Sequence, residues 1–243
     1  MRYGIISDIH SNYEALMTVL RELDQRGIDR LLCLGDIVGY GPNPNECCDE
    51  LRRRDCLAIA GNHDEAAISA EAPHAFNALA REAIAWTKAE LSPENQAFLA
   101  ALPRERNFDT FTIVHGAPVF HFDYILDVTD AQSAFPHAQT PLTFIGHTHI
   151  AEVFFQDDGG RAYHLKLAHG GKIDIIASCR YIINPGSVGQ PRDRNPQASF
   201  AYYDEEQRTV EIRRVSYDVS RVQELMQHAK LPVQLAERLT IGY

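Results

Sequence analysis

An aspartate and a histidine stand two positions apart at the end of the first apolar run of the sequence. Asp8 and His10 follow Ile5 and Ile6. In an extended segment, residues i and i+2 project to the same side, so both side chains would enter one cleft. A carboxylate and an imidazole can bind one divalent cation there. A helix-capping Asp beside a surface His would give the same pattern, so the rest of the chain has to decide.

Other short apolar runs are followed by side chains of the same kinds. The runs cover residues 30–34, 56–60, 109–114 and 142–145, and they are followed by Asp36, by Asn62 with His63, by His115, and by His147 with His149. Open α/β sheets collect ligands beyond the carboxyl ends of their strands. We therefore predict strands that deliver these side chains to one edge. Mixed oxygen and imidazole donors without Cys indicate a catalytic metal site rather than a closed structural zinc site.

Helical patterns separate the strands in the first half of the chain. Apolar residues recur at helical spacing between Asn12, a plausible cap, and Gly27, a helix terminator. A second helix is predicted over 45–54, and a helical cover without a strand over about 71–102. Residues 117–139 read as an irregular segment whose aromatic side chains could wall a pocket. The later pattern predicts antiparallel hairpins over 151–167, further strands over 172–216, and helices over 218–227 and 233–239.

Composition restricts the class of protein and its partners. A chain of 243 residues with 45% hydrophobic and 23% charged residues fits one globular domain over 1–243. The net charge of -10 argues against extended nucleic acid as a partner. Five cysteines without Cys-x-x-Cys spacing, and a start without a secretory leader, predict reduced thiols in the cytoplasm. No apolar run approaches the roughly 18 residues of a membrane span, so no membrane partner is expected.

Five motifs in this order resemble those of calcineurin-like metallophosphoesterases. They are Asp8-x-His10, Gly35-Asp36, Gly61-Asn62-His63-Asp64, His115-Gly116 and Gly146-His147-x-His149. The later stretch 184–189, Asn-Pro-Gly-Ser-Val-Gly, looks like the small bacterial and archaeal phosphodiesterase branch. The resemblance implies an α/β fold, a four-layer αββα sandwich of two mixed sheets flanked by helices, with the metal site at the carboxyl ends of strands.

The resemblance also implies a ligand set for two divalent ions, among which manganese is favoured over iron, zinc, nickel or cobalt. Asp36 would bridge the two ions, and the other ligands would be Asp8, His10 and His149 for the first and Asn62, His115 and His147 for the second. Ions about 3.5 to 4 Å apart clamp a phosphoryl group and lower the pKa of a bridging water, producing hydroxide for in-line attack. His63 would be catalytic, protonating the leaving oxygen or binding a phosphate oxygen.

One departure from the superfamily pattern indicates which of its branches this chain resembles more closely. Protein Ser/Thr phosphatases have Gly-Asp followed by x-x-Asp-Arg-Gly, whereas here Gly39 and Tyr40 replace that Asp and Arg. The departure disfavours phosphoprotein hydrolysis and symmetrical dinucleoside tetraphosphatases. Small phosphodiesterases and asymmetrically cleaving dinucleoside-polyphosphate hydrolases resemble this chain more closely.

Three further residues are candidates for substrate binding. Arg192 could contact a distal phosphate, because guanidinium suits bidentate oxygen contacts, or it could be a solvated loop arginine. Tyr40 and Tyr124 could stack on a base or sugar, or they could pack beneath loops.

The predicted function is two-metal hydrolysis of a phosphoester (EC 3.1 type) or phosphoanhydride (EC 3.6.1 type) bond. The substrate would be a small phosphorylated molecule such as a phosphodiester, a nucleotide or a dinucleoside polyphosphate. A non-catalytic protein-interaction scaffold on the same fold and a nuclease are the alternatives. The retained ligands count against the scaffold and the acidic charge counts against the nuclease. The sequence leaves the oligomeric state open, a homo-oligomer included.

Overall fold

Two mixed six-stranded sheets form the centre of the structure, a computed structural model that describes residues 1–70 and 76–243. The first sheet has the order β3 (Leu57–Ala58), β2 (Arg30–Cys33), β1 (Arg2–Ile6), β11 (Ala198–Asp204), β12 (Thr209–Val215) and β9 (Gly171–Asp174). The second has the order β4 (Glu105–Asn107), β5 (Phe111–Val114), β6 (Leu142–Phe144), β10 (Arg180–Pro185), β7 (Ala151–Gln156) and β8 (Ala162–Lys166). Strands β1 to β3 pair in parallel, as do β5, β6 and β10, while the other pairs are antiparallel.

The central strands are buried on both faces. Ile5 packs into the core between the two sheets, whereas its neighbour Ile6 packs into the core beneath the helices, as the alternation of a strand requires. Phe111 and Phe144 of the second sheet contact Tyr203 of the first sheet in the inter-sheet core. Burial on both faces explains why these strands read as continuous apolar runs.

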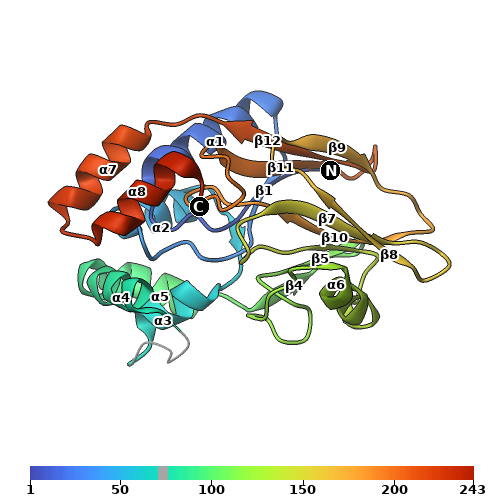
Figure 1. Cartoon of the computed structure of the whole chain (residues 1–243), viewed down its shortest axis with the longest axis horizontal. Helices are drawn as coiled ribbons and strands as arrows, with labels where there is room; N and C mark the ends of the chain where they lie inside the picture. The colour runs from blue at the N-terminus through green and yellow to red at the C-terminus, as the bar shows by residue number, and fades with distance from the viewer. Residues whose placement is uncertain (71–75) are drawn as a thin grey trace.

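Helices cover the outer faces of both sheets (Figure 1). Over the first sheet lie α1 (Tyr13–Arg26), α2 (Pro44–Arg53), α3 (Asn62–Ile68), α4 (Ala78–Glu90) and α5 (Pro93–Ala100). Over the second lies α6 (Val128–Ala134), followed by the 3-10 turn η1 (Phe135–His137). The last two helices, α7 (Val219–His228) and α8 (Val233–Ile241), pack against each other and against α4. The predicted αββα sandwich is therefore confirmed.

Most predicted elements agree with the structure to within a few residues. Asn12 caps α1, with its side chain accepting from Ala15 N, and Gly27 ends that helix in the left-handed conformation. The helical cover consists of α4 and α5, while residues 71–75 of the predicted cover lie outside the described residues. In the part of the chain that the structure describes, no helix is both long and apolar enough to cross a membrane.

The sequence pattern missed two elements and was wrong about one segment. It indicated neither helix α3 nor strand β4, and β4 has only three residues and no buried position. The irregular segment expected over 117–139 contains α6 and η1. Asp127 starts α6 because its carboxylate accepts from the backbone N–H groups of Thr129 and Asp130, at 2.7 and 3.0 Å. A helix of seven residues is too short to show a clear 3.6-residue period.

The parallel strands of both sheets end at the same edge of the sandwich, and the loop that follows β10 closes against the loop that follows β1. Val188 N donates to Ser7 O at 2.9 Å and Gly189 N donates to Asp8 O at 3.0 Å. A Cβ atom on Gly189 would lie 1.7 Å from the carbonyl oxygen of Ile9. Glycine is therefore required for this close approach.

We expect Gly189→Ala to lower the free energy of unfolding by about 1 to 3 kcal/mol, because the backbone must move to accommodate the methyl group. Urea denaturation measures the change. Gly159→Ala is the matched control, because a Cβ atom there meets only the Asp157 side chain, at 3.3 Å. Equal stability of the two variants would contradict the steric account.

Glu50 on α2 is a buried carboxylate whose partners are Arg53 Nη2 at 2.6 Å and Arg54 Nε at 2.7 Å. The hydrogen bond from Arg53 and then that from Arg54 lower the pKa of Glu50 to about 2. A folded-state pKa below that of the unfolded chain stabilises the protein above the unfolded pKa of about 4.3, and the stabilisation is lost as pH falls through about 2.

Glu50→Gln should therefore lower the free energy of unfolding by about 1 to 3 kcal/mol at pH 7. The difference from the wild-type protein should shrink between about pH 4 and pH 2. Denaturation curves across this pH range give the comparison. Glu224→Gln, in an exposed pair with Arg221, should change stability by less than about 1 kcal/mol. A pH-independent deficit in Glu50→Gln would rule out the charge as its cause.

Candidate metal centre

The residues that the sequence predicted as metal ligands meet in the loops at the carboxyl edge of the parallel strands. Of these strands, β1 is followed by Asp8 and His10, β2 by Asp36, β3 by Asn62, β5 by His115, and β6 by His147 and His149. The Asp and His side chains of this set are buried. The first three strands belong to one sheet and the last two to the other, so the site lies where the two sheets meet.

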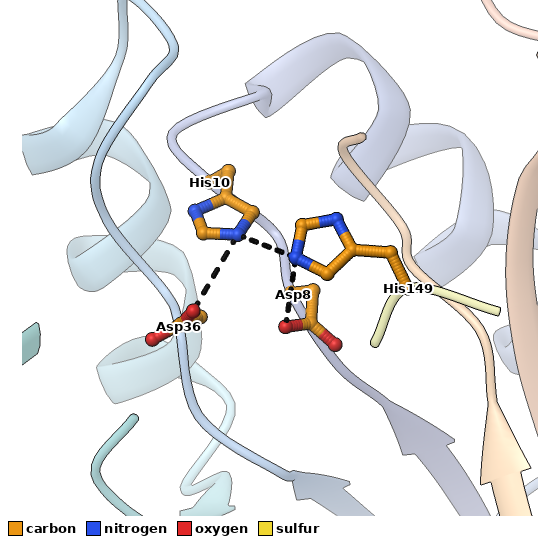
Figure 2. Close-up of side chains that lie close together, drawn as sticks. All are labelled: Asp8, His10, Asp36 and His149. Atoms are coloured by element: carbon orange, nitrogen blue, oxygen red, sulfur yellow. Dashed lines mark hydrogen bonds and ion pairs between the residues drawn. The ribbon is translucent and has the colours of Figure 1, made fainter. Parts of the chain in front are cut away.

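A first group of ligand atoms surrounds one point, as Figure 2 shows. It consists of atoms from Asp8, His10, Asp36 and His149 that all lie within 4.8 Å of one another. His10 Nε2 lies 3.1 Å from His149 Nε2 and 3.5 Å from Asp36 Oδ2. His149 Nε2 in turn lies 3.3 Å from Asp8 Oδ1.

A second group shares Asp36 with the first. Asp36, His115 and His147 offer ligand atoms within 4.8 Å of one another. His115 Nε2 lies 3.4 Å from Asp36 Oδ2 and 3.2 Å from Asn62 Oδ1. The Asp and His residues of the two predicted ligand sets therefore fall into two groups that share Asp36, and Asn62 lies beside the second group.

Backbone carbonyls orient three of the four histidines. The Nδ1–H group of His10 donates to Val38 O at 3.1 Å, that of His149 to Gln190 O at 2.6 Å, and that of His115 to Leu34 O at 2.7 Å. Because a carbonyl only accepts, Nδ1 must carry the hydrogen in each ring. The Nε2 atoms then face the cluster, which is the arrangement typical of metal-bound histidine.

The electrostatics of the cluster favour a cation at its centre. Burial lowers the pKa of His10 and of His149 well below the usual value, and burial together with His115 lowers that of His147 to about 3. Burial opposes a proton on His115 as well, but the nearby Asp36 carboxylate outweighs it and raises the pKa of His115 to about 9. A site of converging acceptors that attracts a proton suits divalent cations.

The convergence of these side chains requires unusual backbone conformations. Five non-glycine residues of the cluster have left-handed φ angles: Asp8 (52°), His10 (48°), Asp36 (53°), His147 (69°) and His149 (62°). Left-handed backbone is uncommon for residues with a side chain, and such strain concentrates at functional sites. The strand ends are thus bent to aim these side chains inward rather than to continue the sheets.

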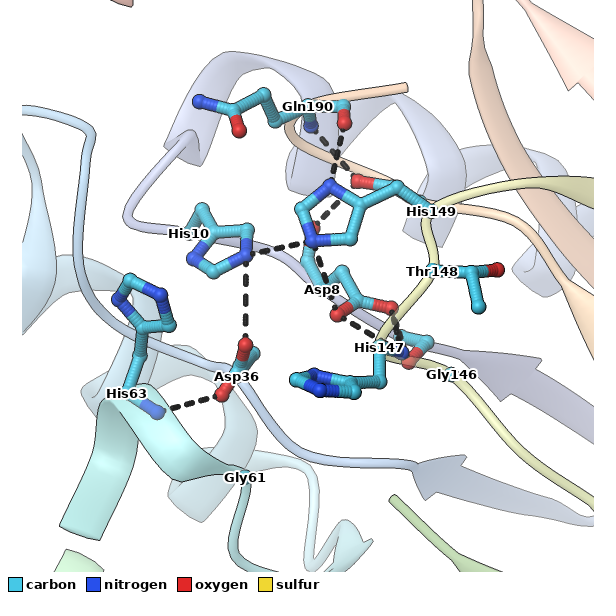
Figure 3. Close-up of polar contacts among 12 residues, drawn as sticks. Asp8, His10, Asp36, Gly61, His63, Gly146, His147, Thr148, His149 and Gln190 are labelled. Carbon is cyan, nitrogen blue, oxygen red and sulfur yellow. Dashed lines mark hydrogen bonds and ion pairs between the residues drawn. The ribbon is translucent and has the colours of Figure 1, made fainter. Parts of the chain in front are cut away.

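His63 lies beside the cluster rather than within it (Figure 3). Its backbone N–H donates to Asp36 Oδ1 at 2.8 Å, and its ring centroid lies 4.9 Å from that of His10. Within residues 1–70 and 76–243 its buried Nδ1 has no hydrogen-bond partner. A Cβ atom on Gly39 would lie 2.6 Å from that Nδ1, so Gly39 leaves room for the ring. Burial lowers the pKa of His63 to about 4.

The three predicted substrate-binding residues lie close to the cluster. The ring of Tyr124 stacks on that of His147 with centroids 4.0 Å apart, and Tyr124 is 49% exposed. Tyr40 is buried against His10, with ring centroids 4.7 Å apart, which fits the packing alternative. The half-buried Arg192 places its guanidinium carbon 5.9 Å from the centroid of the Tyr40 ring.

Two residues that support the cluster received no predicted role from the sequence, although Asp64 belongs to one of the five motifs. Gln190 holds His149 through its carbonyl, and Asp64 accepts from the backbone N–H groups of Gly61 and Val38 at 2.9 and 3.1 Å. Asp64 is the third residue of α3, so a helix-capping pattern could have identified it. Gln190 lies 41 residues from His149 in the sequence, and no local pattern predicts that contact.

Comparisons with known proteins agree with the fold and the motifs. The model of the calcineurin-like phosphoesterase superfamily domain matches residues 1–208. An uncharacterized protein of Methanocaldococcus jannaschii is 41% identical over 250 residues, which cover 98% of this chain and 97% of the relative. A crystal structure of a metallophosphoesterase from Sphaerobacter thermophilus shares 38% identity at a TM-score of 0.88, covering 100% of this chain and 99% of that one.

A more distant structure supports the fold alone. A hypothetical protein from Pyrococcus horikoshii OT3 has a TM-score of 0.79 at 21% identity, covering 100% of this chain and 98% of the other. The matched residues 1–208 include every strand of the described residues except β12, and they include all the predicted metal ligands. The chain therefore belongs to the calcineurin-like phosphoesterase superfamily.

Proposed function

We propose that this protein is a two-metal-ion hydrolase that cleaves a phosphoester or phosphoanhydride bond of a small phosphorylated substrate. The observation that carries the proposal is the position of Asp36, whose Oδ2 lies 3.5 Å from His10 Nε2 and 3.4 Å from His115 Nε2. One carboxylate between two groups of buried donors is the arrangement expected for a dinuclear centre. Superfamily membership supports the same class of reaction.

The carboxylate, imidazole and amide groups of the predicted ligands are of the types that bind divalent cations. Asp8, His10 and His149 would hold the first ion, Asn62, His115 and His147 the second, and Asp36 both. The chemistry that such cations supply when bound is Lewis-acid activation of water and of phosphoryl oxygens. Manganese is the first metal to test, because mixed oxygen and imidazole donors suit it.

His63 is proposed as the catalytic residue outside the ligand set. Its backbone N–H fixes Asp36, while its ring lies against that of His10 and carries an Nδ1 without a partner among the described residues. From this position the imidazole would bind a phosphate oxygen or pass a proton to the leaving oxygen. Gly39 occupies the place where related phosphatases have an Asp, so no carboxylate at that position raises the pKa of His63.

The substrate would be small and anionic. Two divalent cations would outweigh the charges of Asp8 and Asp36, so the cleft can attract a phosphate despite the net charge of -10. The same overall charge is unfavourable for extended nucleic acid. A phosphodiester, a nucleotide or a dinucleoside polyphosphate in the cytoplasm fits these requirements.

Metal-dependent turnover tests the proposal. Protein stripped with a chelator is resupplied with Mn²⁺ or another divalent ion, and hydrolysis of p-nitrophenyl phosphate, bis-p-nitrophenyl phosphate and diadenosine tetraphosphate is followed. We expect activity only with metal, and the preferred compound identifies the type of bond. Two tightly bound ions per chain without any turnover would favour the protein-interaction scaffold instead.

Asp36→Asn should lose metal and activity together, because the shared carboxylate would hold both ions. Metal content by mass spectrometry and turnover are measured on the same preparation. Asp158→Asn, at an exposed turn between β7 and β8, is the control and should retain both properties. Full activity in Asp36→Asn would refute the dinuclear assignment.

His63→Ala should keep both metals but slow turnover by about 10² to 10⁴, the contribution typical of a positioned acid or base. Steady-state kinetics and metal analysis together separate this outcome from loss of the metal centre. The exposed His228→Ala on α7 serves as the control. If His63→Ala hydrolysed substrate at the wild-type rate, His63 would have no catalytic role.

A further inference from the structure

Two arginines converge on one side-chain oxygen at the rim of the metal centre. Arg192 Nη2 donates to Gln190 Oε1 at 2.9 Å, and Arg238 Nη1 donates to the same oxygen at 3.4 Å. Arg192 lies in the loop between β10 and β11, whereas Arg238 lies on α8. A single neutral amide oxygen thus holds two guanidinium groups side by side.

Neither guanidinium is neutralised within residues 1–70 and 76–243. The ion pairs of the described residues include no carboxylate within 4.0 Å of Arg192 or Arg238. The Nε of Arg192 is buried and has no acceptor there. Burial, and then the charge of Arg192, lowers the pKa of Arg238. Two adjacent cations without a carboxylate partner among these residues form a site that an anion would complete.

The pair lies next to the predicted ligands. Gln190, which holds both arginines through its side chain, accepts from His149 Nδ1 through its backbone carbonyl at 2.6 Å. Tyr40 is close to both Arg192 and the cluster, because its ring centroid is 5.9 Å from the Arg192 guanidinium carbon and 4.7 Å from that of the His10 ring. A substrate group at the arginines would therefore be close to, but separate from, a group at the metals.

Arg238 comes from a part of the chain that lies beyond the superfamily domain. The domain match ends at residue 208, and α7 and α8 begin at Val219 and Val233. The two helices pack through Val222, Met226, Leu235 and Leu239 against Tyr40 and α4. This packing places α8 beside the rim, so the C-terminal helices add a side chain to a site whose metal ligands all belong to the common domain.

We propose that Arg192 and Arg238 form a second phosphate subsite, and that the substrate is a molecule with at least two linked phosphates, such as a nucleoside polyphosphate. The proposal rests on the proposed function, since the metals would hold the phosphate that is attacked. The arginine pair would hold the next phosphate along the chain. Guanidinium forks match phosphate oxygens, and a substrate with one phosphate would leave the second subsite empty.

Binding of inorganic pyrophosphate and of orthophosphate to Mn²⁺-loaded protein tests the subsite by calorimetry. Arg238→Gln should weaken pyrophosphate binding by about 10- to 100-fold, the loss expected when one charge-assisted hydrogen bond is removed. The effect on orthophosphate should be much smaller. Arg238→Lys keeps the charge without the fork and should fall between Arg238→Gln and wild type. Thermal unfolding of each variant checks that α8 remains folded.

The control is Arg221→Gln on α7, an exposed arginine that should change neither affinity. For turnover, the ratio of kcat/KM for diadenosine tetraphosphate to that for bis-p-nitrophenyl phosphate should fall in Arg238→Gln. Equal losses of pyrophosphate and orthophosphate binding, or no loss of either, would overturn the subsite. Failure of the proposed function looks different, because the wild-type protein would then hydrolyse no compound even when metal is bound.

Discussion

The structure depends on one buried carboxylate that reaches both sheets. Asp36 extends from the end of β2 in the first sheet, and its Oδ2 lies 3.4 Å from the Nε2 of His115, which follows β5 in the second. Its Oδ1 accepts the backbone N–H of His63 at 2.8 Å. Gly61 makes this position accessible, since a Cβ atom there would lie 2.1 Å from Oδ1. A buried carboxylate is stable only when it is paired or bound to a cation, so Asp36 depends on the donors that surround it.

Backbone hydrogen bonds connect the loops that carry the other candidate ligands. Asp8 N donates to Gly35 O and His10 N donates to Asp36 O, each at 3.0 Å, and Gly146 N donates to His115 O at 2.8 Å. These bonds link the ends of neighbouring strands and offset the cost of the left-handed residues. They also explain why the candidate ligands point to common centres. A rigid sandwich with an apolar core between its sheets holds the loops in register.

The C-terminal helices add to this common framework without altering it. All the predicted metal ligands lie within residues 1–208, whereas α7 and α8 follow that domain. Their apolar contacts with α4 and Tyr40 bring Arg238 to the rim, next to Gln190 and Arg192. A shared set of candidate metal ligands combined with an added pair of helices is one physical way to change the substrate that a fold accepts. Function depends on the site rather than on the fold.

The sequence by itself determined the elements and the donor types. Apolar runs and helix-capping residues such as Asn12 indicated most strands and helices. Both signals are contained in short segments of sequence, because a buried face imposes a repeat along its own element and a cap contacts the first turn of its own helix. The residues after those runs identified the candidate ligands. Only the tertiary structure decided that His10 Nε2 lies 3.1 Å from His149 Nε2, 139 positions away, and that Arg238 approaches Gln190. Such contacts depend on how the two sheets and the last helices pack in space, and no periodicity within one segment encodes that packing.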